Sequence, residues 1–123
     1  MTLTDKQFAT LWGEALVSHD RDSYISDWSL SSIWGVDPEP SPDLTEIIVA
    51  VENIWNVAHM TVKDIRTSTG LTQVLFAQRF CLPTRTLVNW EVAGENHRKC
   101  PDYLRLLLAE SCGLLRVERK SLK

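Results

Sequence analysis

The side chains with catalytic potential in this sequence are mostly carboxylates. Asp20 and Asp22 flank Arg21, and further acids occur in the proline-rich stretch 35–43. Carboxylates act in catalysis when a nucleophile, a second base or a metal ligand accompanies them. No such pairing is recognisable around these acids, and the chain has no glycine-rich phosphate-binding loop. The sequence therefore predicts no catalytic residues and favours a protein that is not an enzyme.

Thiol and imidazole groups are the other candidates for chemistry, because both bind metal ions. The nearest grouping is His97, Cys100 and Cys112, which lacks the paired Cys-x-x-Cys spacing of zinc sites. The cysteines are odd in number and lie in or beside expected helices, which is unlike a disulfide framework. We expect reduced thiols, with Cys100 and Cys112 in the core, and neither a metal ion nor another cofactor.

Charge is distributed unevenly along the chain. Residues 1–60 include 2 basic and 10 acidic residues, a net of −8, whereas residues 61–123 include 11 basic and 6 acidic residues, a net of +5. This asymmetry predicts a cationic module that binds a phosphate-bearing partner, joined to an acidic module that faces a second subunit or another protein. The alternative is a dipolar fold without a polyanion partner.

Nothing in the sequence indicates a membrane protein. With 123 residues and 44% hydrophobic content, the chain fits one compact domain or two very small ones. It contains no run of about eighteen apolar residues, and it does not begin with a basic stretch followed by an apolar one. We therefore expect a cytoplasmic protein with no membrane partner.

The N-terminal region, residues 1–43, is expected to be acidic and helical. Thr4 and Gln7 have the spacing of a capping box, so a helix should begin near Asp5. Its apolar stripe comprises Phe8, Leu11, Trp12, Ala15 and Leu16. A second helix is expected over 22–30, and the proline-rich stretch 35–43 should be a surface linker.

The segment 44–59 has the strongest helical pattern. Its apolar residues recur at steps of three and four, namely Leu44, Ile47, Ile48, Val51, Ile54, Trp55 and Ala58. One face of this helix must therefore be buried. Because only a Met-Thr step separates it from the next helical segment, we expect a connecting helix that packs on the C-terminal core.

From Thr61 onward, capping and stop residues mark four short helices. Thr61 and Thr72 can cap the first two, and Gly70 can end the first. The third is expected over 84–91, directly after Pro83, and the fourth over 101–112. Residues 60–115 should thus form a four-helix domain, followed by a basic C-terminal tail over 116–123.

This domain resembles the Cro/CI-type (XRE) helix-turn-helix DNA-binding family over residues 62–115. The matching positions are Leu71, Thr72, Gln73, Ala77, Phe80, Leu82, Thr86, Leu87, Trp90, Glu91 and the segment 102–114. The small Ala77 lets two helices approach, while Leu82, Leu87 and Trp90 lock the second helix against the core. The resemblance implies an all-α fold, with a lambda-repressor-like core of four short helices and a helical N-terminal extension.

The resemblance also implies which residues contact bases. In such proteins the helix that corresponds to 84–91 lies in the major groove. Its base-facing positions in this chain are Thr84, Arg85, Val88 and Asn89. Arg85 can donate two bonds to a guanine, Asn89 can pair with an adenine, and Val88 can touch a thymine methyl group.

Phosphate contacts are expected from two places. Gln73, Thr72 and Thr86 would contact phosphate as in the family and set the register on the duplex. Asn96, His97, Arg98 and Lys99 form a polar, basic cluster. From this cluster, Arg98 and Lys99 are expected to reach a phosphate.

Two features depart from the family pattern. Cys81 stands where the family usually has a glycine with a positive backbone angle, a conformation that costs another residue about 1 kcal/mol. The loop 92–100 is longer than the usual turn, and Val92 replaces a polar residue that often contacts the DNA backbone. The longer loop and Val92 therefore affect which phosphates of the duplex this domain would contact.

By this resemblance the chain is expected to be a sequence-specific transcriptional regulator, in particular a repressor of its own gene. One recognition helix reads only a few base pairs, so we expect a homodimer on double-stranded DNA with a palindromic operator. The candidate dimer faces are the tryptophan-bearing N-terminal helices and the apolar residues Leu114, Leu115 and Val117. The alternative is an antitoxin, or a phage or mobile-element protein modulator such as an anti-CRISPR or its associated regulator, that binds a protein through the acidic N-terminal half.

Overall fold

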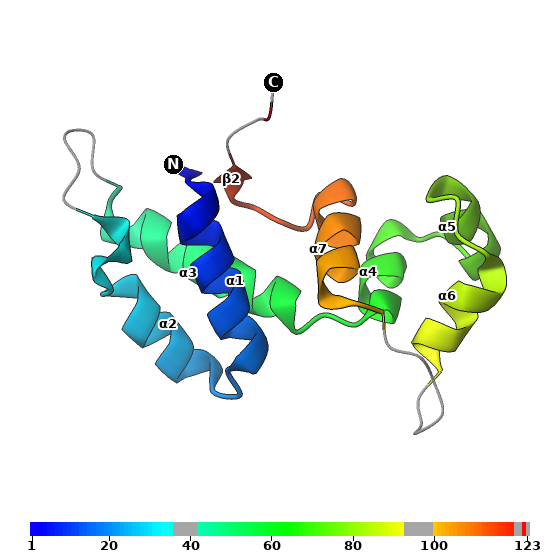
Figure 1. Cartoon of the computed structure of the whole chain (residues 1–123), viewed down its shortest axis with the longest axis horizontal. Coiled ribbons are helices and arrows are strands. Elements are labelled where there is room, and N and C mark those ends of the chain that lie inside the picture. Colours follow the sequence, from blue (N-terminus) through cyan, green and yellow to red (C-terminus); the bar gives the residue numbers. More distant parts are fainter. Residues whose placement is uncertain (36–41, 93–99, 120–121, 123) are drawn as a thin grey trace. The chain divides into compact units, whose positions relative to one another are not determined.

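The computed structural model describes residues 1–35, 42–92, 100–119 and 122. These residues are predominantly helical, as the sequence predicts, and contain seven α-helices, one short 3-10 helix and two short strands. They belong to two compact units (Figure 1): unit 1 combines Met1–His59 with Leu115–Lys123, and unit 2 is Met60–Leu114. None of the described helices is both long and apolar enough to cross a membrane.

Unit 1 begins with helix α1 (Asp5–Val17), whose start is fixed by the predicted capping box. The Gln7 backbone N–H donates to Thr4 Oγ1 at 3.1 Å, and the Thr4 N–H donates to Gln7 Oε1 at 2.9 Å. These two bonds satisfy amide groups near the helix start. The buried residues of α1 belong to the predicted stripe, namely Phe8, Leu11, Trp12 and Ala15.

Helix α2 (Arg21–Ser29) is offset by one residue from the predicted span and is followed by the 3-10 helix η1 (Ser32–Trp34). Tyr24 of α2 is buried, and its hydroxyl donates to the Leu11 carbonyl at 2.7 Å. Burial, with a smaller contribution from the charge of Glu14, raises the pKa of Tyr24 above its usual range. This phenol therefore stays protonated and joins α2 to α1 as a donor.

Helix α3 (Leu44–Ala58) ends one residue before the predicted limit. It packs against both α1 and α2, with Val51 and Ile54 among its fully buried residues. This packing corrects the expected grouping of the helix with the C-terminal core. The helix belongs to unit 1, because α1 and α2 supply the apolar surface that its buried face requires.

The C-terminal segment also differs from the expectation. Instead of forming a separate tail, it belongs to unit 1, where strand β2 (Glu118–Arg119) pairs in parallel with strand β1 (Thr2–Leu3). Leu3 is buried, and the Arg119 guanidinium lies 4.3 Å from the centre of the Phe8 ring. Backbone pairing is thus supported by apolar burial and by a cation–π contact.

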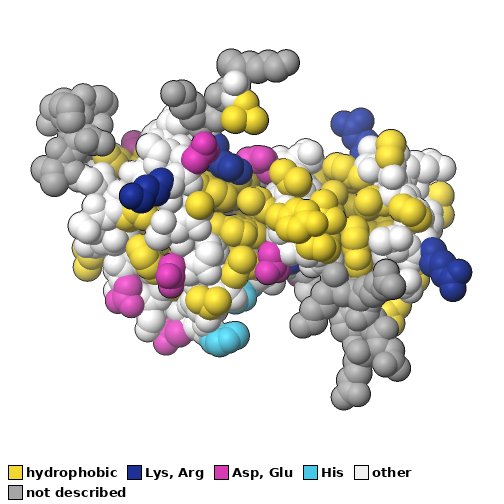
Figure 2. Space-filling model, in the orientation of Figure 1, with side chains coloured by type: hydrophobic (Ala, Val, Ile, Leu, Met, Phe, Trp, Pro, Cys, Tyr) yellow, Lys and Arg dark blue, Asp and Glu magenta, His cyan; other side chains and the backbone are white. Residues whose placement is uncertain are grey.

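This chain path changes the charge of the two parts. With residues 115–123 included, unit 1 carries 6 basic and 11 acidic residues, a net of −5, while unit 2 carries 7 basic and 5 acidic residues, a net of +2. The contrast in sign that the sequence shows is therefore kept but weakened. Figure 2 shows acidic side chains spread over the helices of unit 1.

The described part of unit 2 contains the four predicted helices. They are α4 (Val62–Thr69), α5 (Gln73–Arg79), α6 (Thr84–Glu91) and α7 (Asp102–Ser111). Thr61 caps α4 by accepting from the Asp64 N–H at 3.1 Å, and Thr72 caps α5 by accepting from the Leu75 N–H at 3.2 Å. Gly70 ends α4 in the left-handed conformation, with φ of 74°. The predicted start and stop residues are thereby confirmed.

A small apolar core holds these four helices together. Its buried residues are Val62, Ile65, Phe76, Ala77, Leu87, Cys100, Leu108 and Ala109. The expectation that the cysteines are core thiols holds for Cys100, whose pKa is raised by burial to about 11. Cys112 is half-buried, and Cys81, in the turn between α5 and α6, is exposed.

Candidate nucleic-acid interface

A tight turn joins α5 to α6. Its first residues are Phe80 and Cys81, and the Leu82 N–H donates back to the Ala77 carbonyl at 2.8 Å. Cys81 has φ of 55°, the positive backbone angle expected at this position. Of the four residues expected to pack between the helices, Ala77 and Leu87 are buried, while Leu82 and Trp90 are half-buried.

The left-handed residue at this turn allows a direct test of backbone strain. Because Cys81 is exposed and has a positive φ, Cys81→Gly should raise the free energy of unfolding of unit 2 by about 1 kcal/mol. Cys81→Ala keeps the Cβ atom and removes the thiol, so it should change stability by less than about 0.5 kcal/mol. Urea unfolding followed by circular dichroism measures both variants. A glycine variant no more stable than the alanine variant would contradict the strain.

Helix α6 carries the four residues predicted to contact bases. Arg85 and Asn89 are exposed and lie one turn apart, while Thr84 and Val88, also one turn apart, are half-buried. Leu87 anchors the inner side of the helix. Within the described part of the chain, the side chains of Arg85 and Asn89 form no hydrogen bond or ion pair. A guanidinium and a carboxamide are therefore presented together to solvent.

The residues predicted to contact phosphate differ in their availability. The Thr72 hydroxyl oxygen accepts the Leu75 N–H, which leaves the hydroxyl proton to be donated elsewhere. The Gln73 side-chain amide donates to Glu91 Oε1 at 3.3 Å, so it already has a partner within the protein. Thr86 is half-buried in α6.

The other predicted phosphate contacts, Arg98 and Lys99, lie outside the described residues, as does the rest of the basic cluster. Among the described basic residues of unit 2, those that form no ion pair with a described carboxylate are Lys63, Arg79 and Arg85. The described part of unit 2 has five basic and four acidic residues, a net of +1.

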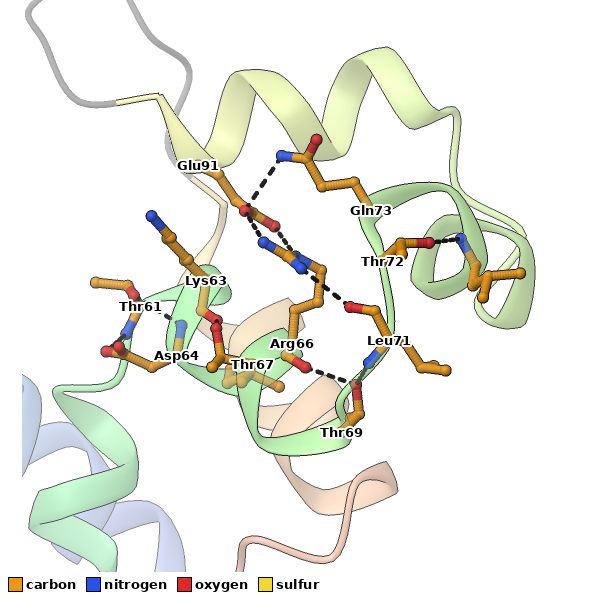
Figure 3. A network of polar contacts seen from close by, with 12 residues as sticks. Thr61, Lys63, Asp64, Arg66, Thr67, Thr69, Leu71, Thr72, Gln73 and Glu91 are labelled. Carbon is orange, nitrogen blue, oxygen red and sulfur yellow. Dashed lines mark hydrogen bonds and ion pairs between the residues drawn. The ribbon is translucent and has the colours of Figure 1, made fainter.

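A bidentate ion pair lies at the end of α6 (Figure 3). Arg66 of α4 donates through Nε to Glu91 Oε2 at 2.7 Å and through Nη2 to Glu91 Oε1 at 2.9 Å. Through Nη1 it also donates to the Leu71 carbonyl at 3.0 Å. The side chains of Arg66 and Glu91 are 17% and 5% exposed. Both charges are therefore largely removed from water and depend on each other.

The surroundings of Glu91 keep its carboxylate ionised. Hydrogen bonds from Arg66 hold the pKa of Glu91 below its ordinary value, although burial acts in the opposite direction. The bond from Gln73 and the charges of Arg66 and Lys63 lower the pKa further. In return, the bond to Glu91 raises the pKa of Arg66.

This ion pair determines how α6 is held, and sequence reasoning missed it. Arg66 belongs to α4, Gln73 is the first residue of α5 and Glu91 is the last residue of α6, so one network joins three helices. Arg66 and Glu91 are 25 residues apart, and no local spacing connects them. One local signal was available: Arg66 stands directly after Ile65, which is buried, so its charged group lies close to the core and requires a partner.

The chemical character of this surface rests on two features. An arginine and an asparagine stand one turn apart on the outer face of α6. The same helix is held at its middle by Leu87 and at its end by the pair of Arg66 and Glu91.

Comparison of the chain with family models, with curated proteins and with solved structures gives no match.

Proposed function

We propose that this chain is a sequence-specific DNA-binding protein, in which unit 2 is a helix-turn-helix domain of the Cro/CI type and α6 is its recognition helix. The observation that carries the proposal is the outer face of α6, where Arg85 and Asn89 are exposed without a partner among the described residues. Their side chains match the donor and acceptor groups of base edges in the major groove. The positive φ of Cys81 and the buried Ala77 suit a close pair of helices of this class.

Each residue on this face has a defined role in the proposal. Arg85 donates two parallel hydrogen bonds to O6 and N7 of a guanine, and Asn89 pairs with N6 and N7 of an adenine. Val88 contacts the methyl group of a thymine, and Thr84 donates its hydroxyl proton to a base or to the adjacent phosphate. A good pair contributes roughly 1–3 kcal/mol of discrimination against the wrong base.

Register on the duplex comes from contacts to phosphate. Thr72 has a hydroxyl proton to donate, whereas the amide group of Gln73 is partly committed to Glu91. Arg98 and Lys99 add positive charge to the proposed phosphate contacts. Because phosphate contacts release counterions, the affinity should fall as the salt concentration rises.

The proposal includes a homodimer that represses its own gene. One recognition helix reads only a few base pairs, so a two-fold dimer on a palindromic site supplies the affinity that a monomer lacks. Tyr103 and Leu107, which are exposed one turn apart on α7, offer an apolar surface for such a contact. A dimer bound at the operator would then exclude polymerase.

Arg85→Ala should weaken binding to the specific site by roughly 5- to 150-fold, which corresponds to about 1–3 kcal/mol. The site is obtained from DNA immediately upstream of the protein's own gene and, independently, by selection from a random-sequence pool. A gel shift at two salt concentrations, with excess unrelated DNA, should show a specific and salt-sensitive complex for the wild type. Circular dichroism should show that Arg85→Ala keeps the fold, because Arg85 is exposed.

Lys6→Ala is the charge-matched control for this experiment. Lys6 is an exposed residue of α1 in unit 1, so its loss removes one positive charge without touching α6. It should change the affinity by less than about twofold. An Arg85→Ala protein that binds the site as tightly as the wild type would remove α6 as the recognition helix. Failure to enrich any sequence from the pool would remove the DNA-binding proposal itself.

A further inference from the structure

A groove in unit 1 between α2 and α3 lies outside the proposed DNA site. Its volume is about 290 Å³. It is lined by Asp22, Ile25, Ser26, Ser29, Leu30, Leu44 and Ile48. Arg21, at the start of α2, forms an ion pair with Glu52 of α3 at 2.7 Å through Nη2. This pair connects the two helices next to Asp22, which lines the groove. The groove is therefore formed by two helices whose relative position is held by packing and by an ion pair.

The apolar side chains along this groove are exposed for their type. Leu30 is 77% exposed, Leu44 is 52% exposed and Ile48 is 37% exposed. Leu44 and Ile48 are one turn apart and form one ridge, while Ile25 and Leu30 lie on the opposite wall. Single exposed leucines are ordinary, but apolar residues gathered along a groove mark a surface that binds a partner.

One residue of the groove carries a hydroxyl group that lacks a partner. Ser29 is 7% exposed, and its Oγ forms no hydrogen bond with any described residue. Buried hydroxyl groups in folded proteins normally have such a bond. Because the Oγ atom is itself inaccessible to solvent, Ser29 belongs to the floor of the groove and does not select the occupant.

Charge indicates which kind of occupant fits. Among the described lining residues, Asp22 is the charged one, and its side chain is 96% exposed. Arg21 lies 3.9 Å from Asp22, but its shorter contact, at 2.7 Å, is with Glu52. Unit 1 as a whole has a net charge of −5. A second copy of this face would oppose like charges, whereas a segment with lysine or arginine would be attracted.

We propose that the groove between α2 and α3 is a docking site for a basic amphipathic helix of another protein. Its apolar side chains seat between Ile25, Leu30, Leu44 and Ile48, and a lysine or arginine at its edge meets Asp22. Recognition of a helix in a groove works through apolar anchors spaced by three or four residues, with charges setting the orientation. The proposal goes beyond DNA binding, because it uses no residue of unit 2.

The probe is a fluorescent amphipathic peptide of about 18 residues, five helical turns, with leucine on one face and lysine on the other. Titration with the full chain, followed by fluorescence anisotropy, should give saturable binding. A scrambled peptide of the same composition and a peptide with glutamate in place of lysine should each bind at least about tenfold more weakly. Equal binding of the scrambled peptide would overturn the docking site, and equal binding of the glutamate peptide would overturn the basic partner.

The combined substitution of Leu30→Ser and Leu44→Ser should weaken binding of the leucine–lysine peptide by at least about tenfold. Val17→Ser is the matched control, because Val17 is a 69% exposed apolar residue of α1 that does not line the groove. It should leave the affinity within about twofold of the wild type. Circular dichroism checks that both proteins fold, and a double variant that binds like the wild type would overturn the proposal.

Two further measurements separate the other outcomes. Amide shifts in a nitrogen–proton NMR spectrum should move at Ser29 and Ile48 when the peptide is added, and shifts confined to other elements would overturn the placement. Sedimentation equilibrium should show the same oligomeric state for the wild type and the double variant. If the double variant loses a dimer that the wild type forms, the groove belongs to a second copy and the proposal fails. The double variant should keep its affinity for the selected DNA, so the result is independent of the proposed function.

Discussion

Arg66→Ala should lower the free energy of unfolding of unit 2 by about 3 kcal/mol, a large part of the stability of a small domain. Removing the guanidinium deprives Glu91, which is 5% exposed, of two hydrogen bonds and of its opposite charge. An unpaired charge in such a place destabilises far more than the loss of an exposed pair. Hydrogen exchange of the Ile65 and Leu87 amides measures the change, because both residues lie in the core of unit 2.

Lys63→Ala is the matched control for the loss of Arg66. Lys63 is also a basic residue of α4, but it is exposed and influences Glu91 through its charge. Its removal should cost less than about 0.5 kcal/mol. Equal destabilisation by the two substitutions would show that the ion pair does not hold α4, α5 and α6 together.

The ion pair also gives the stability of unit 2 a pH dependence of defined sign. The pKa of Glu91 is lowered in the folded chain from its ordinary value of 4.5. The stabilisation is therefore fully present above the ordinary value and is lost as the pH falls through the lowered pKa. The difference in stability between the wild type and Glu91→Gln should be largest near neutral pH and should shrink below about pH 4. Urea unfolding at several pH values measures it, and a constant difference down to about pH 3 would contradict the assignment.

Phe8→Ala should destabilise unit 1 by about 3–5 kcal/mol. The Phe8 ring is buried, and its centre lies 6.2 Å from that of the stacked Trp12 ring. The Arg119 guanidinium lies over the Phe8 ring, 4.3 Å from its centre. The substitution leaves a cavity in the core and removes a contact between α1 and β2. Four of the five tryptophans belong to unit 1, so tryptophan fluorescence during urea unfolding reports mainly on that unit.

Leu30→Ala provides the comparison for the loss of Phe8. Leu30 is also a large apolar residue of unit 1, but it is exposed. Its truncation should change the free energy of unfolding by about 0.5 kcal/mol or less. If the two variants unfold at the same urea concentration, the Phe8 ring does not contribute to the core as its burial indicates.

The helices could be predicted because the signals that begin and end them are local. The capping pair Thr4 and Gln7 is three residues apart, and Thr61 stands directly before the helix that it caps. Gly70 ends that helix, since it takes a backbone angle that other residues avoid. The positive φ of Cys81 is different, because a cysteine gives no indication of it. That prediction depended on the family resemblance, and the angle itself is confirmed.

The grouping of the helices into units could not be predicted in the same way. Periodicity shows that one face of α3 is buried, but it does not show which apolar surface covers that face. The pairing of β1 with β2 joins two-residue strands at opposite ends of the chain, which carry no strand pattern long enough to detect. Contacts of this kind are decided by the tertiary fold.

The candidate site was predicted in part. The sequence placed Arg85 and Asn89 on the outer face of a short helix, and both are exposed there. Their contact with bases stays a prediction. The bond between Gln73 and Glu91 was not foreseen, because the sequence gives no sign that the carboxylate at the end of α6 is held by Arg66.

Unit 1 is made from two stretches of chain, with the whole of unit 2 between them. Domains tend to fold as their sequence emerges during synthesis. Residues 60–114 are therefore all synthesised before β2, the strand that pairs with β1, because β2 follows them in the chain. Synthesis therefore supplies every residue of unit 2 before it supplies every residue of unit 1. The unit whose synthesis starts first is the last to be completed.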